Sequence, residues 1–206
     1  MRPSLNNGYS GPIIADTMLE RCLKIADKQQ QASNFFIKIL SVLIGTSLIT
    51  LSSYVTVPLY PVPVTAQTLV VLLIGLSFGP HLAFITISLY LFQGAFGLPV
   101  FAGGTGGLGA LLGPTGGYLF GFLAAGSLLG FLAQRGFGKS FVTTIIAMVA
   151  GNAVIYLLGV SWLTHFIGIE NALVQGVLPF LYGDALKILA AATLMPMAWK
   201  LLPYIR

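Results

Sequence analysis

The chain is organised as a series of long apolar stretches separated by short segments that are polar or rich in proline and glycine. This pattern predicts six membrane-crossing helices, because an apolar helix of about 20 residues is needed to cross the hydrocarbon core of a bilayer. We place them at about residues 35–56, 66–78, 81–97, 117–134, 141–163 and 178–201. The second is short for a full crossing, and Pro196 is expected to kink the sixth near its end.

Prolines and glycines mark the ends of these stretches. Three prolines lie between Pro58 and Pro63, and Gly79-Pro80 predicts a sharp reversal between the second and third helices. Residues 1–34 are polar and mixed in charge, unlike a cleavable signal peptide. The prediction is an all-α integral membrane protein. A cytoplasmic tail over 1–34, where a short amphipathic helix at about 13–30 fits the pattern, precedes a six-helix domain over 35–206.

Composition supports a membrane protein and excludes several other classes. Hydrophobic residues make up 56% of the chain and charged residues only 7%, whereas about 25% of the residues in a soluble domain are charged. The single cysteine, Cys22, excludes an internal disulfide framework and a cysteine-based metal cluster. The net charge of +5 comes from residues spread along the flanks of the helices, so we expect membrane lipid and no nucleic acid as a partner.

The positive charges indicate an orientation. The connections expected on one side, at 56–66, 98–117 and 164–177, contain no lysine or arginine. Because cytoplasmic segments carry the excess of lysine and arginine, both termini are expected to be cytoplasmic. The basic residues that lie on that inner side are Arg2, Arg21, Lys24, Lys28, Lys38, Arg135, Lys139, Lys200 and Arg206.

The remaining basic residue, Lys187, lies three positions after Asp184 within the sixth apolar stretch. Residues at i and i+3 share one face of a helix. An ionisable group at the centre of a membrane helix costs roughly 2.5–3.5 kcal/mol, so such groups usually face the protein interior and mark a substrate or ion path. At 1.5 Å per residue from Leu178, the pair lies about 9 and 13 Å along the helix, in the outer half. It predicts a site for a small polar ligand, and the alternative is a structural pair that neutralises itself.

The outer connections have an unusual composition. Ten glycines lie between Gly94 and Gly117. The run lacks the ending of a phosphate-binding loop, so a nucleotide site is not expected. Half of these glycines are expected to serve helix packing. The run as a whole predicts a re-entrant or lid-like segment that lines a cavity, with the 58–67 connection as a second lid.

Three segments in these connections carry a family resemblance. They are Pro61-Val-Pro-Val-Thr-Ala-Gln-Thr68, Gly97-Leu-Pro-Val-Phe-Ala-Gly-Gly104 and Gly107-Leu-Gly-Ala-Leu-Leu-Gly-Pro-Thr-Gly-Gly-Tyr118. Over about residues 36–202 the chain closely resembles the BioY family of biotin-binding substrate-capture (S) subunits of energy-coupling factor (ECF) transporters. The resemblance implies a six-helix fold with cytoplasmic termini in the cell membrane. It also implies biotin as transported ligand, no cofactor, and as partners a transmembrane coupling protein and two ATPase subunits.

Biotin chemistry suits the charged pair. Its ureido ring has two N–H donors that Asp184 can accept, and its carboxylate or its ureido carbonyl can pair with Lys187. Tyr118, Phe101 and Val100 are expected to provide apolar walls. Further candidates are polar residues that are individually more often packing residues: Asn152 and Tyr156 on one helix face, Gln93, and Gln67 and Thr105 on the two lids.

Several other functions remain as alternatives. An S component for another vitamin would share the fold, and a stand-alone biotin transporter driven by protons would use Asp184, although no inverted repeat is evident. An enzyme is not expected, because an aspartyl protease needs two carboxylates and no other span contains one. No nucleotide-binding motif occurs in the chain, so ATP dependence requires other polypeptides. Ser41 and Gly45 show the small-residue spacing of a helix-docking face, without the alanines usual for this fold.

Overall fold

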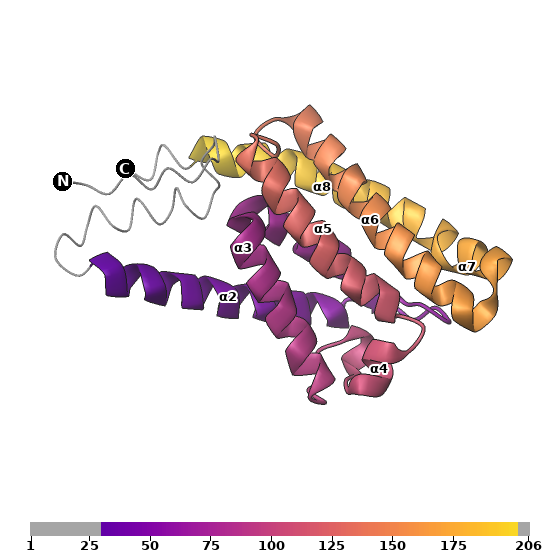
Figure 1. Ribbon diagram of the computed structural model, residues 1–206. Helices are drawn as coiled ribbons and strands as arrows, with labels where there is room; N and C mark the ends of the chain where they lie inside the picture. The colour runs from indigo at the N-terminus through magenta and orange to yellow at the C-terminus, as the bar shows by residue number, and fades with distance from the viewer. Residues whose placement is uncertain (1–29, 202–206) are drawn as a thin grey trace.

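The computed structural model describes residues 30–201, with side chains from residue 35 onward. The amphipathic helix expected at about 13–30 lies almost entirely outside the described residues. In the described part of the chain, five helical segments are long and apolar enough to cross a membrane, and the fifth, Ile169–Leu201, joins α7 (Ile169–Gly176) and α8 (Leu178–Leu201). The main ones are α2 (Gln30–Tyr54), α3 (Gln67–Ala95), α5 (Gly116–Gln134), α6 (Phe141–Ile167) and α8 (Leu178–Leu201) (Figure 1).

Short elements connect these helices. A two-stranded antiparallel pair, β1 (Thr56–Val57) and β2 (Val64–Thr65), links α2 to α3. The 3-10 turn η1 (Ala102–Gly104) and the short helix α4 (Leu108–Leu112) precede α5, and α7 (Ile169–Gly176) precedes α8. The sequence indicates only a mildly amphipathic connection where α7 lies. The predicted bounds of the sixth helix match α8, and those of the fourth differ from α5 by one residue.

Helix α3 combines the second and third predicted stretches, and it is broken at the predicted position. Gly79 has φ 76° and ψ 173°, outside the helical range, and Pro80 follows it. This region of backbone space is essentially restricted to glycine. Val71 and Ile87 lie at equal sequence distances before and after Gly79, and both approach Gly126 of α5. The chain therefore reverses at Gly79, and the two halves of α3 lie side by side against α5.

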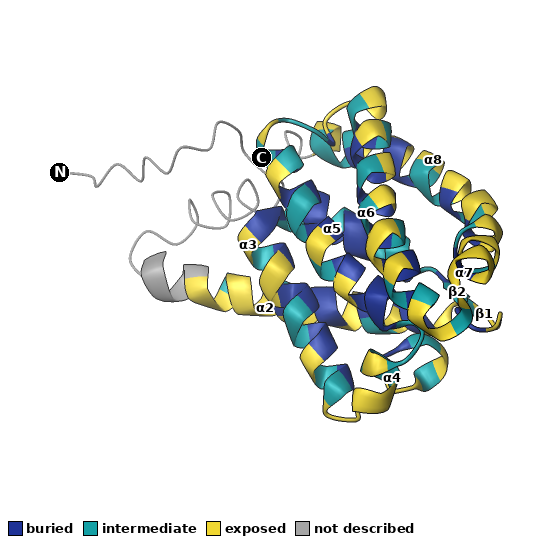
Figure 2. Ribbon diagram, turned by 45° about the vertical axis from the view of Figure 1, so that its right-hand side comes forward, coloured by how far each residue is buried: buried dark blue, intermediate teal, exposed yellow. Residues whose placement is uncertain are grey.

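Helices α3 and α5 form the centre of the molecule, where Figure 2 shows many of the buried residues, and α6 packs against α5. The close approach of α3 to α5 depends on small residues. A Cβ atom added at Gly75 would lie 2.6 Å from the carbonyl oxygen of Gly126. Absence of side chains lets helices pack closely inside a membrane, where burial of apolar surface gives little driving force between them.

Helix α2 lies at the periphery. In the most apolar part of α2, 28% of the residues are buried, compared with 61% in the corresponding part of α5. Helix α2 packs mainly against α3. Gly45, which has small-residue spacing with Ser41, is buried against Ile74, Phe78 and Thr86 of α3. Its small size is therefore already used within the chain, and the position of a docking face for a partner stays a prediction.

Candidate ligand-binding site

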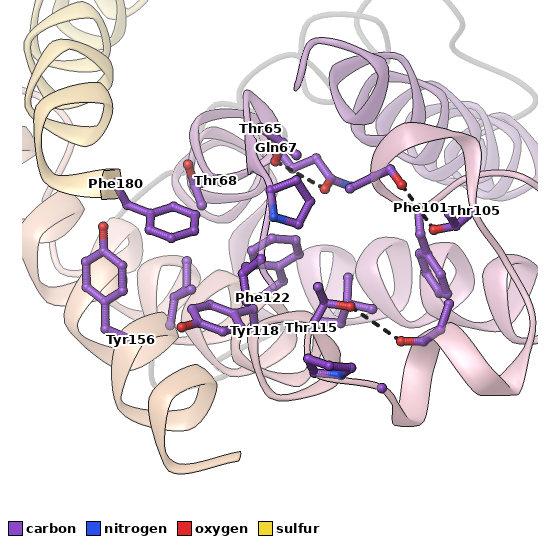
Figure 3. A pocket seen from close by; sticks show the side chains of 18 of the residues that line it. Thr65, Gln67, Thr68, Phe101, Thr105, Thr115, Tyr118, Phe122, Tyr156 and Phe180 are labelled. Atoms are coloured by element: carbon purple, nitrogen blue, oxygen red, sulfur yellow. Dashed lines mark hydrogen bonds between the residues drawn. The ribbon is translucent and has the colours of Figure 1, made fainter. Parts of the chain in front are cut away.

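A cavity of about 310 Å³, seen from close by in Figure 3, lies at the end of the bundle where Figure 2 shows β1, β2, α4 and α7. Its volume is at the lower end of the range for small-molecule sites. Two segments cover it: residues 62–68, which include β2 and the start of α3, and residues 101–115, which include η1 and α4. We call these the first and second covering segments. The rest of the wall comes from Tyr118, Leu119, Phe122, Ile155, Tyr156 and Phe180.

Aromatic rings form one wall of this cavity. Tyr118 of α5 stacks on Phe180 of α8 with ring centroids 6.1 Å apart, and Tyr156 of α6 meets Phe180 edge-on at 6.3 Å. The Tyr118 hydroxyl donates a hydrogen bond of 2.9 Å to the carbonyl oxygen of Gly176, which fixes α5 to the end of α7. Such a wall suits a ligand with an apolar ring.

The predicted charged pair forms, and Asp184 is buried with 4% of its surface exposed. Lys187 Nζ lies 2.9 Å from Asp184 Oδ1 and donates a second hydrogen bond of 2.8 Å to Thr68 Oγ1. The Thr68 hydroxyl lies 3.4 Å from Asp184 Oδ1, and the Tyr156 hydroxyl donates to Asp184 Oδ2. We call Thr68, Tyr156, Asp184 and Lys187 the polar cluster.

Only part of the polar cluster reaches the cavity. Thr68 and Tyr156 line it, whereas Asp184 and Lys187 lie directly behind these two hydroxyl groups. Among the described residues no charged side chain lines the cavity. Thr68 is the second residue of α3, so the Asp184 carboxylate lies beside a helix N-terminus, where the helix dipole favours a negative charge.

The structure places the other predicted residues in two groups. Gln67, Thr105, Tyr118, Tyr156 and the apolar candidate Phe101 line the cavity. Asn152, Gln93 and Val100 do not. Asn152 is buried, and its Oδ1 atom has no hydrogen-bond partner in the described part of the chain.

Thr68 was not among the predicted site residues, although it ends the first segment that carries the family resemblance. Its contact with α8 depends on the first turn of α3 lying beside Asp184 and Lys187. Phe122, Ile155 and Phe180 were also not predicted, because an apolar residue in a membrane helix gives no sequence signal for a cavity.

Comparison with known proteins identifies the family. The BioY family model matches residues 26–204, which include every described residue. The chain belongs to the BioY family. With its long apolar helices, this BioY chain is a multi-pass protein of the cell membrane.

Similar BioY proteins come from distant organisms. The probable biotin transporter BioY of Pyrococcus horikoshii is 42% identical over 156 residues, covering 75% of this chain and 90% of the relative. The biotin transporter BioY of Thermotoga maritima is 39% identical over 150 residues, covering 72% and 88% respectively.

A solved structure supports the fold. The crystal structure at 2.1 Å of the S-component for biotin from an ECF-type ABC transporter superposes with a TM-score of 0.71 and 27% sequence identity. The match covers 79% of this chain and 90% of the crystallised one. The helical arrangement of this BioY protein is therefore that of a solved S-component.

Proposed function

We propose that this BioY protein captures biotin at the outer face of the cell membrane, as the S component of an ECF-type transporter. The observation that carries the proposal is the cavity next to the polar cluster, in a chain that matches the BioY family over residues 26–204. The relatives named as biotin transporters and the solved S-component for biotin support it.

The polar cluster has unused hydrogen-bonding capacity that matches a ureido group. A carboxylate has about four lone-pair sites, and three donors contact Asp184: Lys187, Thr68 and Tyr156. An ammonium group has three N–H donors, and Lys187 directs two of them to Asp184 and Thr68. One acceptor site and one donor therefore remain for a ligand.

In the proposed complex the ureido ring enters between Thr68 and Tyr156. One of its N–H groups donates to Asp184, and Lys187 donates to the ureido carbonyl or to the carboxylate of biotin. The thiophane ring and the methylene chain lie against Tyr118 and Phe101, which line the cavity. An analogue lacking the ureido group would leave buried polar atoms unpaired, which gives the site its selectivity.

Other predicted residues have supporting places in this proposal. Gln67 and Thr105 lie on the two covering segments and face the cavity. Asn152 lies one helical turn from Tyr156 on α6, and its buried Oδ1 atom has no hydrogen-bond partner in the described part of the chain. Gln93 lies half-buried in the last turns of α3, and its contact with ligand stays a prediction.

The proposed topology has six membrane crossings and both termini in the cytoplasm. The reversal at Gly79 separates α3 into two antiparallel halves, each counted as one crossing. The first half, residues 67–78, is about 18 Å long at 1.5 Å per residue, shorter than the hydrocarbon core. Because this half is too short to cross the membrane, Gly79 and the start of α3 cannot lie at opposite membrane surfaces. With Gly79 at the inner surface, the first covering segment is placed within the outer leaflet.

Partners complete the proposed transporter. The chain contains no nucleotide-binding motif, so the energy for transport comes from two ATPase subunits through a transmembrane coupling protein. The solved S-component belongs to an assembly of the ECF type, which supports these partners. Among the described membrane-length segments, only the combined segment α7–α8 is less buried than α2. Most of the apolar surface of α2 is therefore available to lipid or to a partner.

Equilibrium binding of radiolabelled biotin to the purified protein tests the function. We expect saturable binding at one site, displaced by unlabelled biotin and unaffected by excess thiamine or riboflavin. Displacement by another vitamin would indicate a different S component, and absence of biotin binding would overturn the proposal. Uptake into proteoliposomes with and without the ATPase subunits then separates ATP-driven transport from a stand-alone, proton-coupled transporter.

A further inference from the structure

Tyr90 is a fully buried residue in the second half of α3, and it does not line the cavity. Its hydroxyl group accepts a hydrogen bond from Gln67 Nε2 and donates one of 3.1 Å to the carbonyl oxygen of Val100. Gln67 belongs to the first covering segment, and Val100 directly precedes the second. One buried hydroxyl group therefore joins the two segments that cover the cavity.

Additional contacts extend this junction on each side. Gln67 Oε1 accepts a hydrogen bond of 3.2 Å from Thr65 of β2. On the other side, the ring of Phe101 packs edge-on against Tyr90, with centroids 5.5 Å apart. The Phe101 N–H donates a hydrogen bond of 2.9 Å to the carbonyl oxygen of Thr105. Gln67 and Phe101 both face the cavity (Figure 3).

A second tyrosine contacts the neighbouring carbonyl in a different environment. The Tyr54 hydroxyl of α2 donates a hydrogen bond of 2.6 Å to the carbonyl oxygen of Pro99, and this contact is exposed. Water can replace an exposed donor, whereas a buried carbonyl left without one bears the full cost of its desolvation. The Tyr90 contact is therefore the one that resists separation of the covering segments.

We propose that Tyr90 is a positioning residue for ligand retention, which holds the two covering segments in one arrangement across the cavity. Movement of either covering segment away from the other breaks a buried hydrogen bond at Tyr90, which slows any escape of ligand that depends on such movement. The inference rests on the proposed binding of biotin in this cavity, and it assigns retention of that ligand to a hydroxyl group outside the cavity wall.

The test is the dissociation rate of radiolabelled biotin from the purified Tyr90→Phe variant. This change removes the hydroxyl and keeps the ring that packs on Phe101. We expect dissociation to become about tenfold faster or more, with little change in association, because most affinity differences between related complexes lie in the dissociation rate. Tyr54→Phe is the matched control and should alter dissociation by no more than about twofold.

Three outcomes are distinguishable. Failure of the wild-type protein to bind biotin would overturn the proposed function and with it the basis for this inference. Wild-type binding with equal dissociation rates for Tyr90→Phe and Tyr54→Phe would overturn the role of Tyr90 alone. The role of Tyr90 in retention would also be overturned if Tyr90→Phe lowered the melting temperature equally with and without biotin and left the dissociation rate unchanged. A purely structural hydrogen bond would give that result.

Discussion

Among individual side chains, Asp184 shows how a charge is accommodated inside this bundle. Its two oxygens receive contacts from Lys187, Thr68 and Tyr156, so the charge is balanced and hydrogen-bonded without exposure to solvent. A buried ion pair is weak evidence for stability, because removal of both charges from water costs about as much as their attraction returns. The presence of such a pair beside a cavity is therefore better explained by ligand binding than by folding.

Replacement of Thr68 by valine tests the role of its hydroxyl group. Thr68→Val keeps the shape but removes the acceptor of one Lys187 hydrogen bond. We expect biotin affinity to fall about tenfold or more, since a hydrogen bond to a charged group contributes roughly 1.5–3 kcal/mol. Thr68→Ser restores the hydroxyl and should restore most of the affinity in the same equilibrium binding assay. Equal loss in both variants would show that the methyl group, and not the hydroxyl, matters.

The sequence could predict some of these contacts and not others. Asp184 and Lys187 are three residues apart on one helix, so their contact follows from helix geometry alone. Thr68 lies 116 positions before Asp184, and no local pattern reports that the first turn of α3 reaches α8. For the same reason the cavity position of Phe180 and Phe122 could not be distinguished from ordinary packing.

At the scale of the helices, the sequence predicted the bounds of long apolar helices well. It did not predict features that depend on packing between helices. The reversal at Gly79-Pro80 was predictable because proline removes a helix hydrogen bond and glycine tolerates the required backbone angles. Helix α7 was interpreted only as a mildly amphipathic connection, because it is eight residues long and its few buried residues depend on contacts with α6 and α8.

Gly130 of α5 provides a test of the packing at the reversal. A Cβ atom there would collide with the backbone of Gly79 and Pro80, which cannot move aside as a flexible side chain can. We expect Gly130→Ala to destabilise the protein by about 1–3 kcal/mol, the usual cost of overpacking. Thermal unfolding of the purified protein measures this.

The matched control for Gly130→Ala is Gly109→Ala in α4. No atom lies within 4 Å of a Cβ atom added at Gly109, so its melting temperature should equal that of the wild type or exceed it slightly. If Gly130→Ala unfolds at the same temperature as Gly109→Ala, the halves of α3 do not pack on α5 as described.

At the scale of the entire protein, lysine and arginine are unevenly distributed between the two ends, and the cavity lies at one of them. The end that carries the covering segments is the one whose connections lack lysine and arginine, which supports its placement outside the cell. The glycine-rich connection was predicted to form a lid over a cavity, and residues 101–115 do line one. Its arrangement in η1 and α4 was not predictable, because it depends on contacts with α2, α3 and α5.

Cysteine labelling in intact cells tests the proposed orientation. In a Cys22→Ser background, Glu170→Cys should react with a membrane-impermeant maleimide, because Glu170 is exposed in α7 at the cavity end. Arg135→Cys, exposed after α5 at the opposite end, should react only after the membrane is permeabilised. The reverse pattern would show that the cavity faces the cytoplasm.

Binding of biotin to the Asp184→Asn/Lys187→Met double variant separates a binding pair from a structural pair most directly. The double change removes both charges together, so it avoids the uncompensated buried charge that makes single changes destabilising. We predict that this variant inserts and melts near the wild-type temperature but binds biotin at least about a hundredfold more weakly. Wild-type affinity in the folded double variant would contradict the account, because the two charges would then be serving only each other.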